Sequence, residues 1–294
     1  MTVGQRFDKF LTNSGLTTDQ KADGIVKHTG VRKCLNQYYY DSNSEYANSM
    51  LVGSWGEDTQ VRPPRDIDVL FVLPYAVYQR YESKFGNKQS QLLQEVKGVL
   101  ERTYTSTKMR ADGQVVIVPF ASYAVEVVPA FALNNGQYWI CDTNSGGRYK
   151  TTDPNAEQTA IKNSDANSAG NTRHLIKIMK KWQDHCSVPL KSFWIELVAI
   201  EFISTWEHRG KTTVYYDWMV RDFFKYLIGR AWGSASVPGT YETIQLGNDW
   251  ESKAESAHGR AVKACDYEAS QSPTQNTDAW WEWHNIFGDD VPLN

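Results

Sequence analysis

The sequence of 294 residues has no excess of positive charge, few cysteines and no long hydrophobic run. Its 31 lysines and arginines are outnumbered by 34 aspartates and glutamates, so a non-specific grip on a nucleic-acid backbone is not expected. The four cysteines are far apart and form no Cys-x-x-Cys pair, which argues against a structural zinc site or a disulfide framework. Their spacing is typical of buried free thiols in a reducing cytosol.

Signals that direct a chain to a membrane are also missing. Residues 1–11 carry three charged side chains and lack the apolar core of a signal peptide. The most apolar helical stretch, residues 193–206, is interrupted by Glu196 and Glu201 and is too short to span a bilayer. We therefore expect a soluble, cytoplasmic protein with no membrane partner.

The composition, with 41% apolar and 22% charged residues, is that of a globular chain whose length fits two lobes. Hydrophobic periodicity predicts an α+β class: a mixed-sheet lobe with N-terminal helices at residues 1–152, and a helical lobe at residues 153–294. Strands are expected at residues 66–73, 115–120 and 123–131, and helices within residues 1–40, 89–104, 175–182, 193–206, 215–228, 254–265 and 280–287.

Residues 141–170 are rich in Asn, Ser, Gly, Thr and Asp and are expected to be largely loop. Within them, Asp153-Pro154 is typical of a helix start, because a capping residue precedes a proline of the first turn. No strand of comparable strength is expected after residue 140.

One segment carries the candidate chemistry. A Gly53-Ser54 turn is followed, twelve residues after the serine, by Asp66 and Asp68, which alternate with apolar residues on an expected strand. Successive strand residues point to opposite faces, so both carboxylates share one face, with their Cα atoms roughly 6.6 Å apart. Glycine allows the backbone to approach a phosphate closely, and the serine hydroxyl can bind its oxygens.

A third acid, Glu126, is the only charged residue in the apolar segment 123–130. A lone buried carboxylate is costly, and if the two strands are neighbours it faces the aspartate pair. Carboxylates that repel one another take up protons or recruit cations, and hard oxygen ligands favour Mg²⁺ or Mn²⁺. Taken alone, the Gly-Ser pair is typical of a turn, the aspartate pair of a solvated strand end, and Glu126 of an edge-strand residue. Their combination predicts a two-ion site for in-line displacement at phosphorus.

At this point the sequence resembles a known family. Residues 53–74 are similar to the signature of the bacterial cyclic-oligonucleotide synthases, the cGAS/DncV-like nucleotidyltransferases of anti-phage defence. The similarity continues through residues 123–130, 142–154, 174–182 and 190–197. It implies a nucleotidyltransferase fold of the polymerase beta-like type, with a mixed-sheet lobe facing a helical lobe and the active site in the cleft.

The resemblance also implies roles for individual residues. Asp66, Asp68 and Glu126 would bind two Mg²⁺ (or Mn²⁺) ions, although the family usually has aspartate where this chain has Glu126. Donor triphosphate would contact the residues Gly53, Ser54, Lys180 and Ser192. From the pattern alone, Lys180 reads as part of a solvated basic helix face and Ser192 as a helix N-cap.

The implied activity is synthesis of a cyclic di- or trinucleotide from nucleoside triphosphates, ATP among them, with release of pyrophosphate. The product would act on a separate effector protein. Because the chain is slightly acidic, we expect no direct activation by double-stranded DNA or RNA. Two alternatives stay open: a nucleotidyltransferase that makes linear oligonucleotides or modifies an RNA or protein acceptor, and a catalytically silent nucleotide-sensing module.

Overall fold

The computed structural model describes residues 1–270 and 273–293, which form two compact units. The sheet unit consists of Leu16–Asp58 and Arg62–Gln158, and the helical unit consists of Met1–Gly15, Thr59–Val61 and Thr159–Asn294. The first helix therefore packs with the helical unit, through Phe7 and Phe10 of its core. The predicted division into residues 1–152 and 153–294 stays a prediction.

A seven-stranded mixed sheet organises the sheet unit. The strand order is β1-β2-β5-β4-β3, with β6 paired to β5 and β7 to β6. Only β2 and β5 pair in parallel within this sheet, and the other described pairs are antiparallel. The strands are β1 (Ser49–Val52), β2 (Asp66–Val72), β3 (Arg110–Asp112), β4 (Val115–Pro119), β5 (Ala124–Ala132), β6 (Tyr138–Asp142) and β7 (Arg148–Thr152). The helices of this unit are α2 (Thr18–Tyr40), α3 (Gly53–Glu57), α4 (Tyr75–Glu82) and α5 (Lys88–Glu101).

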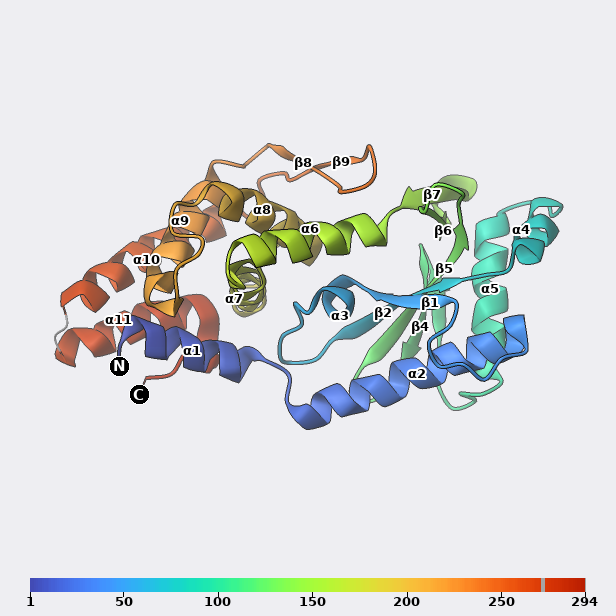
Figure 1. Ribbon diagram of the computed structural model, residues 1–294, viewed down its shortest axis with the longest axis horizontal. Coiled ribbons are helices and arrows are strands. Elements are labelled where there is room, and N and C mark those ends of the chain that lie inside the picture. Colours follow the sequence, from blue (N-terminus) through green and yellow to red (C-terminus); the bar gives the residue numbers. More distant parts are fainter. Residues whose placement is uncertain (271–272, 294) are drawn as a thin grey trace. The chain divides into compact units, whose positions relative to one another are not determined.

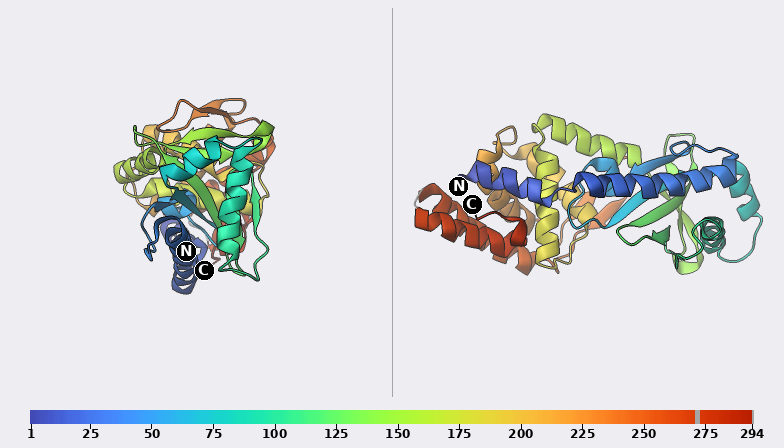
Figure 2. Two further views of the ribbon diagram at one scale, coloured as in Figure 1. Left: turned by 90° about the vertical axis from the view of Figure 1, so that its right-hand side faces the viewer. Right: turned by 90° about the horizontal axis from the view of Figure 1, so that it is seen from below.

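One face of this sheet is covered by α2 and α5, which lie along it in the views of Figures 1 and 2. The alternation of the strands explains this arrangement, because every second residue of β2, β4 and β5 is apolar and fully buried. These side chains form a single core with Val31 and Leu35 of α2 and Leu92 of α5. The start of α2 is defined by a capping box between Thr17 and Gln20.

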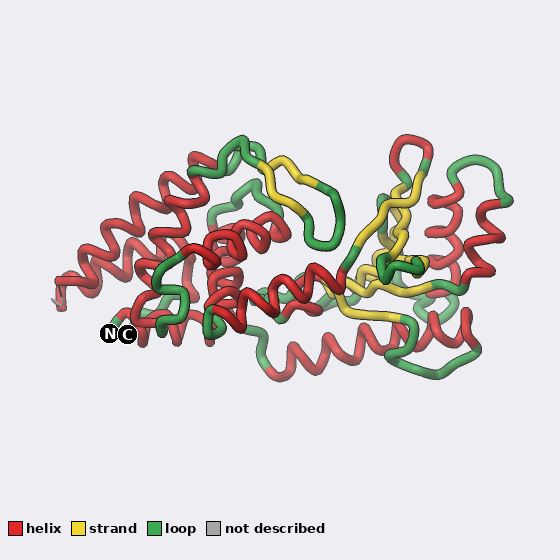
Figure 3. The backbone as a smooth tube through the Cα atoms, turned by 45° about the horizontal axis from the view of Figure 1, so that its top comes forward, coloured by secondary structure: helices red, strands yellow, loops and turns green. Residues whose placement is uncertain are grey.

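The helical unit is built around a core of buried aromatic and aliphatic side chains, and Figure 3 shows its helices and one small hairpin of strands. Trp182 of α7 and Phe224 of α9 meet edge to face there, with ring centroids 5.0 Å apart. The elements are α1 (Val3–Ser14), α6 (Pro154–Asn167), α7 (Asn171–His185), α8 (Ser192–Thr205), α9 (Tyr216–Ile228), β8 (Ser234–Ser236), β9 (Thr243–Gln245), α10 (Glu251–Ser270) and α11 (Pro273–Phe287). The first turn of α6, up to Gln158, still belongs to the sheet unit. Among residues 1–270 and 273–293, no helix combines the length and the apolar character needed to cross a membrane.

The α+β class and the expected order of helices and strands are confirmed, but two local predictions were wrong. Residues 141–170 are not largely loop, because they contain the end of β6, all of β7 and the helix α6. Strands also continue after residue 140, in β7 and in the β8–β9 hairpin. Polar composition here reflects partly exposed strands and a surface helix, and it does not report backbone pairing. The helix start at Asp153-Pro154 is confirmed, with the Asp153 carboxylate accepting from the Ala156 N–H at 3.0 Å.

Candidate active site

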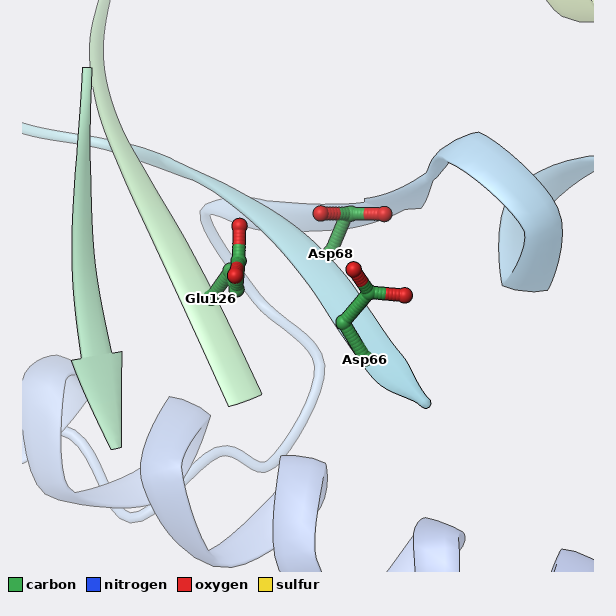
Figure 4. A group of neighbouring side chains, drawn as sticks. All are labelled: Asp66, Asp68 and Glu126. Atoms are coloured by element: carbon green, nitrogen blue, oxygen red, sulfur yellow. The ribbon is translucent and has the colours of Figure 1, made fainter. Parts of the chain in front are cut away.

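Three carboxylates converge on one face of the sheet, where β2 and β5 run side by side. The register pairs Asp68 directly with Glu126, and Asp66 lies two residues earlier on the same face of β2. One carboxylate oxygen from each residue lies within 4.8 Å of those of the other two. Figure 4 shows the side chains of Asp66 and Asp68 rising from one strand and that of Glu126 from its neighbour. The predicted convergence of three carboxylates from two adjacent strands is confirmed in the structure.

The opposite face of the same strands explains why these acids project from the open face of the sheet. Ile67, Val69, Val125 and Val127 alternate with the acids and are completely buried in the core beneath α2 and α5. A slip of the register by one residue would bury the carboxylates and expose these side chains, so the apolar core determines where the acids point. All three acids remain half-buried and open to a ligand.

The electrostatics of the cluster are those of like charges. Burial raises the pKa of Glu126 above its ordinary value, and the negative charge of Asp66 raises it further. Arg110 acts in the opposite direction and lowers the pKa of Glu126. Oxygen donors at this spacing, half-buried and mutually repelling, fit a divalent cation such as Mg²⁺ or Mn²⁺.

Gly53 and Ser54 lie directly beside the carboxylates. Strand β1 ends at Val52, the register partner of Asp68, and the chain enters the short helix α3 at Gly53. Gly53 has φ of +55°, and a Cβ atom on it would lie 2.5 Å from the Oδ2 atom of Asp68. Only glycine therefore allows the backbone to pass this close to the Asp68 carboxylate, and Ser54, half-buried, follows in the first turn of α3.

Two further glycines support this turn, and neither was identified from the sequence as part of the site. A Cβ atom on Gly24 of α2 would lie 2.5 Å from the ring of Trp55 in α3, so the indole packs against bare backbone. A Cβ atom on Gly56 would lie 2.5 Å from the Leu51 carbonyl oxygen, which also accepts from the Gln158 side chain at 2.8 Å. A glycine in the middle of a helix destabilises it, so the position of Gly24 within α2 was a signal in the sequence of a close approach.

Lys180 belongs to the helical unit, where it is almost completely buried. Its ammonium lies 2.6 Å from a carboxylate oxygen of Glu196, and it donates to Thr59 Oγ1 at 2.8 Å and to the Thr59 carbonyl at 3.3 Å. The interpretation of Lys180 as part of a solvated face is wrong, because its ammonium donates to buried acceptors. Lys181 is buried too and pairs with Asp290 at 2.6 Å.

Ser192 is the first residue of α8 and also belongs to the helical unit. The N-cap position is occupied by Lys191, which makes no side-chain capping bond, so the N-cap interpretation of Ser192 is wrong. The Ser192 hydroxyl donates to Gln183 Oε1 at 2.9 Å. Contact of Lys180 and Ser192 with a triphosphate stays a prediction.

Comparisons with known proteins add independent information. The family model of the Second Messenger Oligonucleotide or Dinucleotide Synthetase domain matches residues 1–165. A curated relative, a probable cyclic nucleotide synthase of Bacillus cereus (strain VD146), is 21% identical over 335 residues, and the match covers 99% of this chain and 98% of the relative.

Solved structures of similar shape come from other bacteria. CdnC of E. coli MS115-1, determined with ATP, has a TM-score of 0.70 at 16% identity, and the match covers 98% of each chain. The cyclic AMP-GMP synthase DncV of Vibrio cholerae, determined with the linear intermediate 5′ pppA(3′,5′)pG, has a TM-score of 0.68 at 14% identity, over 99% of this chain and 87% of that chain. The architecture is therefore the fold of these nucleotidyltransferases.

Proposed function

Because the chain belongs to the Second Messenger Oligonucleotide or Dinucleotide Synthetase family, we propose that it joins nucleoside triphosphates into a cyclic di- or trinucleotide and releases pyrophosphate. One observation carries this proposal: Asp66, Asp68 and Glu126 bring their carboxylates together on an otherwise apolar pair of strands. Carboxylates gathered this closely repel one another, and bound divalent cations would offset that repulsion.

The proposed reaction is a repeated nucleotidyl transfer. A ribose hydroxyl of one nucleotide forms a bond to the α-phosphorus of another, and the bond from that phosphorus to the pyrophosphate oxygen breaks. Pyrophosphate leaves with the electron pair, and the hydroxyl proton is released to water. The linear product then undergoes the same transfer within itself, which closes the ring and releases a further pyrophosphate.

The carboxylates of Asp66, Asp68 and Glu126 would hold two divalent ions, Mg²⁺ or Mn²⁺, on the face where they converge. Bound ions of this kind acidify an attacking hydroxyl and neutralise a leaving pyrophosphate. Gly53 would bring backbone N–H groups against the donor triphosphate, and the hydroxyl of Ser54 would bind one of its oxygens. Both lie beside Asp68, so donor and acids share one part of the sheet unit.

Lys180 and Ser192 are proposed as further triphosphate contacts from the family resemblance. An ammonium group has three donors, and the three of Lys180 already serve Glu196 and two oxygens of Thr59. A phosphate oxygen therefore has to replace one of these acceptors. The predicted cleft between the lobes remains part of the proposal.

The relatives support nucleoside triphosphates as substrates. The CdnC structure contains ATP, and the DncV structure contains a linear pppApG intermediate, which is the species expected halfway through a stepwise synthesis. We extend the proposal to ATP as one substrate, to a product that acts on a separate effector in anti-phage defence, and to a cytoplasmic location. The formal charge of −3 favours activity without double-stranded DNA or RNA as an activator.

The proposal is tested by identifying the product. The protein is incubated with labelled ATP, GTP, CTP and UTP, singly and together, with Mg²⁺ or Mn²⁺, and the products are treated with phosphatase and measured by mass spectrometry. A phosphatase-resistant cyclic product, absent with an Asp66→Asn/Asp68→Asn variant, supports the proposal. A phosphatase-sensitive oligonucleotide indicates the linear alternative, and nucleotide binding without pyrophosphate release indicates a silent sensor.

A further inference from the structure

A single row of side chains crosses the sheet at the level of the metal-binding acids. The strand register pairs successive members of this row, which are Val52, Asp68, Glu126, Ile117 and Arg110. Residues that are partners across strands project from the same face of a sheet. The row therefore runs from the residue before the Gly53-Ser54 turn, through two of the acids, to an arginine on β3.

Burial confirms that the far half of the row is on the open face. Val116 and Val118, the neighbours of Ile117 in β4, are completely buried in the core beneath the helices. Ile117 itself is half-buried, and Arg110 is exposed. The structure gives the Arg110 guanidinium no hydrogen bond to another described residue, although its charge acts on Glu126.

The chemistry assigns a direction to this row. In an in-line displacement, the attacking oxygen and the leaving oxygen lie on opposite sides of the phosphorus. The proposed triphosphate site at Gly53 and Ser54 places the leaving pyrophosphate at the β1 end of the row. The attacking ribose hydroxyl therefore approaches from the other end, over Glu126 and Ile117.

We propose that Arg110 binds the 5′-phosphates of the acceptor nucleotide, with the acceptor ribose lying over Ile117. This inference rests on the proposed function and names the second half of the same site. Arg110 is two strands away from Glu126, about 10 Å between Cα atoms, a span that a nucleoside with its first phosphates bridges. A guanidinium suits this role because its planar fork of donors binds phosphate oxygens in pairs.

The test separates the two nucleotides by using analogues that can play only one role. A 2′,3′-dideoxynucleoside triphosphate acts only as donor, because it lacks both ribose hydroxyls. An α,β-methylene nucleoside triphosphate acts only as acceptor, because its bond between the α- and β-phosphates is not cleaved in this reaction. The base of each analogue is the one that the product assay identifies. The unphosphorylated nucleoside serves as a second acceptor.

Wild type is compared with Arg110→Gln and Arg110→Lys, and with Arg102→Gln as a matched control. Arg102 is also exposed and contacts only the Tyr38 ring among the interactions described for it. We expect Arg110→Gln to raise the KM of the triphosphate acceptor by about tenfold or more, with kcat and the donor KM changed less than about twofold. The acceptor KM of Arg110→Lys should lie between those of wild type and Arg110→Gln. The acceptor KM of Arg102→Gln should match that of wild type.

The nucleoside acceptor sharpens the result. It lacks the phosphates that Arg110 is proposed to bind, so its KM should be the same in wild type and in Arg110→Gln. An equal loss with both acceptors would overturn the phosphate contact, and an unchanged KM for the triphosphate acceptor would overturn the inference altogether. If wild type forms no product from any nucleoside triphosphate, the proposed function itself fails. A melting temperature shared by all variants shows that folding does not produce the difference.

Discussion

The molecule contains two clusters of charge that are built in opposite ways. In the sheet unit, Asp66, Asp68 and Glu126 bring three negative charges together, half-buried and with oxygens within 4.8 Å of one another. In the helical unit, Lys180 and Glu196 bring opposite charges to 2.6 Å and bury both. The first cluster gathers charges of one sign, whereas the two charges of the second compensate each other.

This difference separates a site from a structural contact. Carboxylates that repel one another cost folding free energy, so neutralising them should not harm the fold, and such costly clusters are typical of functional sites. A compensated buried pair costs little as it stands but a great deal when one partner is lost. Each cluster therefore predicts a different balance between activity and stability when its residues are changed.

The largest expected effect is on activity, in the cluster of like charges. Asp66→Asn/Asp68→Asn should lower pyrophosphate release by more than about 1,000-fold, because the site loses most of its negative ligands. The same variant should unfold at an equal or higher temperature than wild type in the presence of EDTA, because like-charge repulsion is relieved. A coupled-enzyme assay and thermal unfolding measure the two quantities. Undiminished pyrophosphate release, or marked destabilisation, would contradict the comparison.

The next effect is on stability in the compensated cluster. Lys180→Met leaves Glu196 buried without its partner and should lower the free energy of unfolding by about 3 to 5 kcal/mol. Adding Glu196→Leu should restore most of this loss, since a buried pair replaced by apolar side chains is often neutral. Urea unfolding of wild type, the single variant and the double variant provides the measurement. A single variant as stable as wild type would show that the pair is not buried in solution.

A smaller effect on stability is expected from Asp217 of α9, a buried acid that forms no ion pair with residues 1–270 or 273–293. Burial, opposed by a backbone hydrogen bond from Trp218, raises its pKa to about 6, and Glu268 also raises it whereas Arg221 lowers it. The neutral form is favoured in the fold, so its stabilising contribution is complete below about pH 4 and is lost as the pH rises through about 6. The total is on the order of 3 kcal/mol, from about two pKa units.

The control for this pH dependence is Asp217→Asn, which keeps the size of the side chain and removes the titration. Unfolding free energies of wild type and variant should converge near pH 4 and diverge up to pH 7, with the variant the more stable at neutral pH. Parallel curves for the two proteins across this range would mean that Asp217 does not titrate as described.

The smallest expected effect comes from a change that keeps the charge. Glu126→Asp restores the residue usual in the family and withdraws the carboxylate by one methylene. Activity should stay within about tenfold, equivalent to about 1.4 kcal/mol, while the ratio of Mg²⁺- to Mn²⁺-supported rates changes. Glu126→Gln, with the same length and no charge, should lose far more. Equal activity of Glu126→Gln and wild type would remove Glu126 from the site.

Much of the acid cluster could be predicted from the sequence, because period-two alternation and a lone charge in an apolar strand are local signals. The pairing of Asp68 with Glu126 could not be demonstrated that way, since it joins strands far apart in the chain. Glu196 appeared only as an interruption of an apolar helix, and its partner Lys180 as part of a solvated face. Burial of both depends on neighbours that no local pattern describes.

The loop prediction failed for a related physical reason. Composition reports how polar a segment is, and the strand β7 and helix α6 are polar because most of their residues are at least partly exposed. Their backbone hydrogen bonds depend on a partner strand and on a capping side chain, Asp153. The packing of Trp55 against Gly24 could not be predicted from the sequence either. A glycine within a helix indicates that another group can approach the backbone closely, but it does not identify that group.

The central claim is that these acids exist to hold divalent cations, and direct measurement of ion binding tests it most closely. Mn²⁺ is titrated into the protein with an α,β-methylene nucleoside triphosphate present, and free Mn²⁺ is followed by electron paramagnetic resonance. We predict about two tightly bound ions for each wild-type chain, and loss of this binding in the Asp66→Asn/Asp68→Asn variant. Equal Mn²⁺ binding by the two proteins would contradict the account.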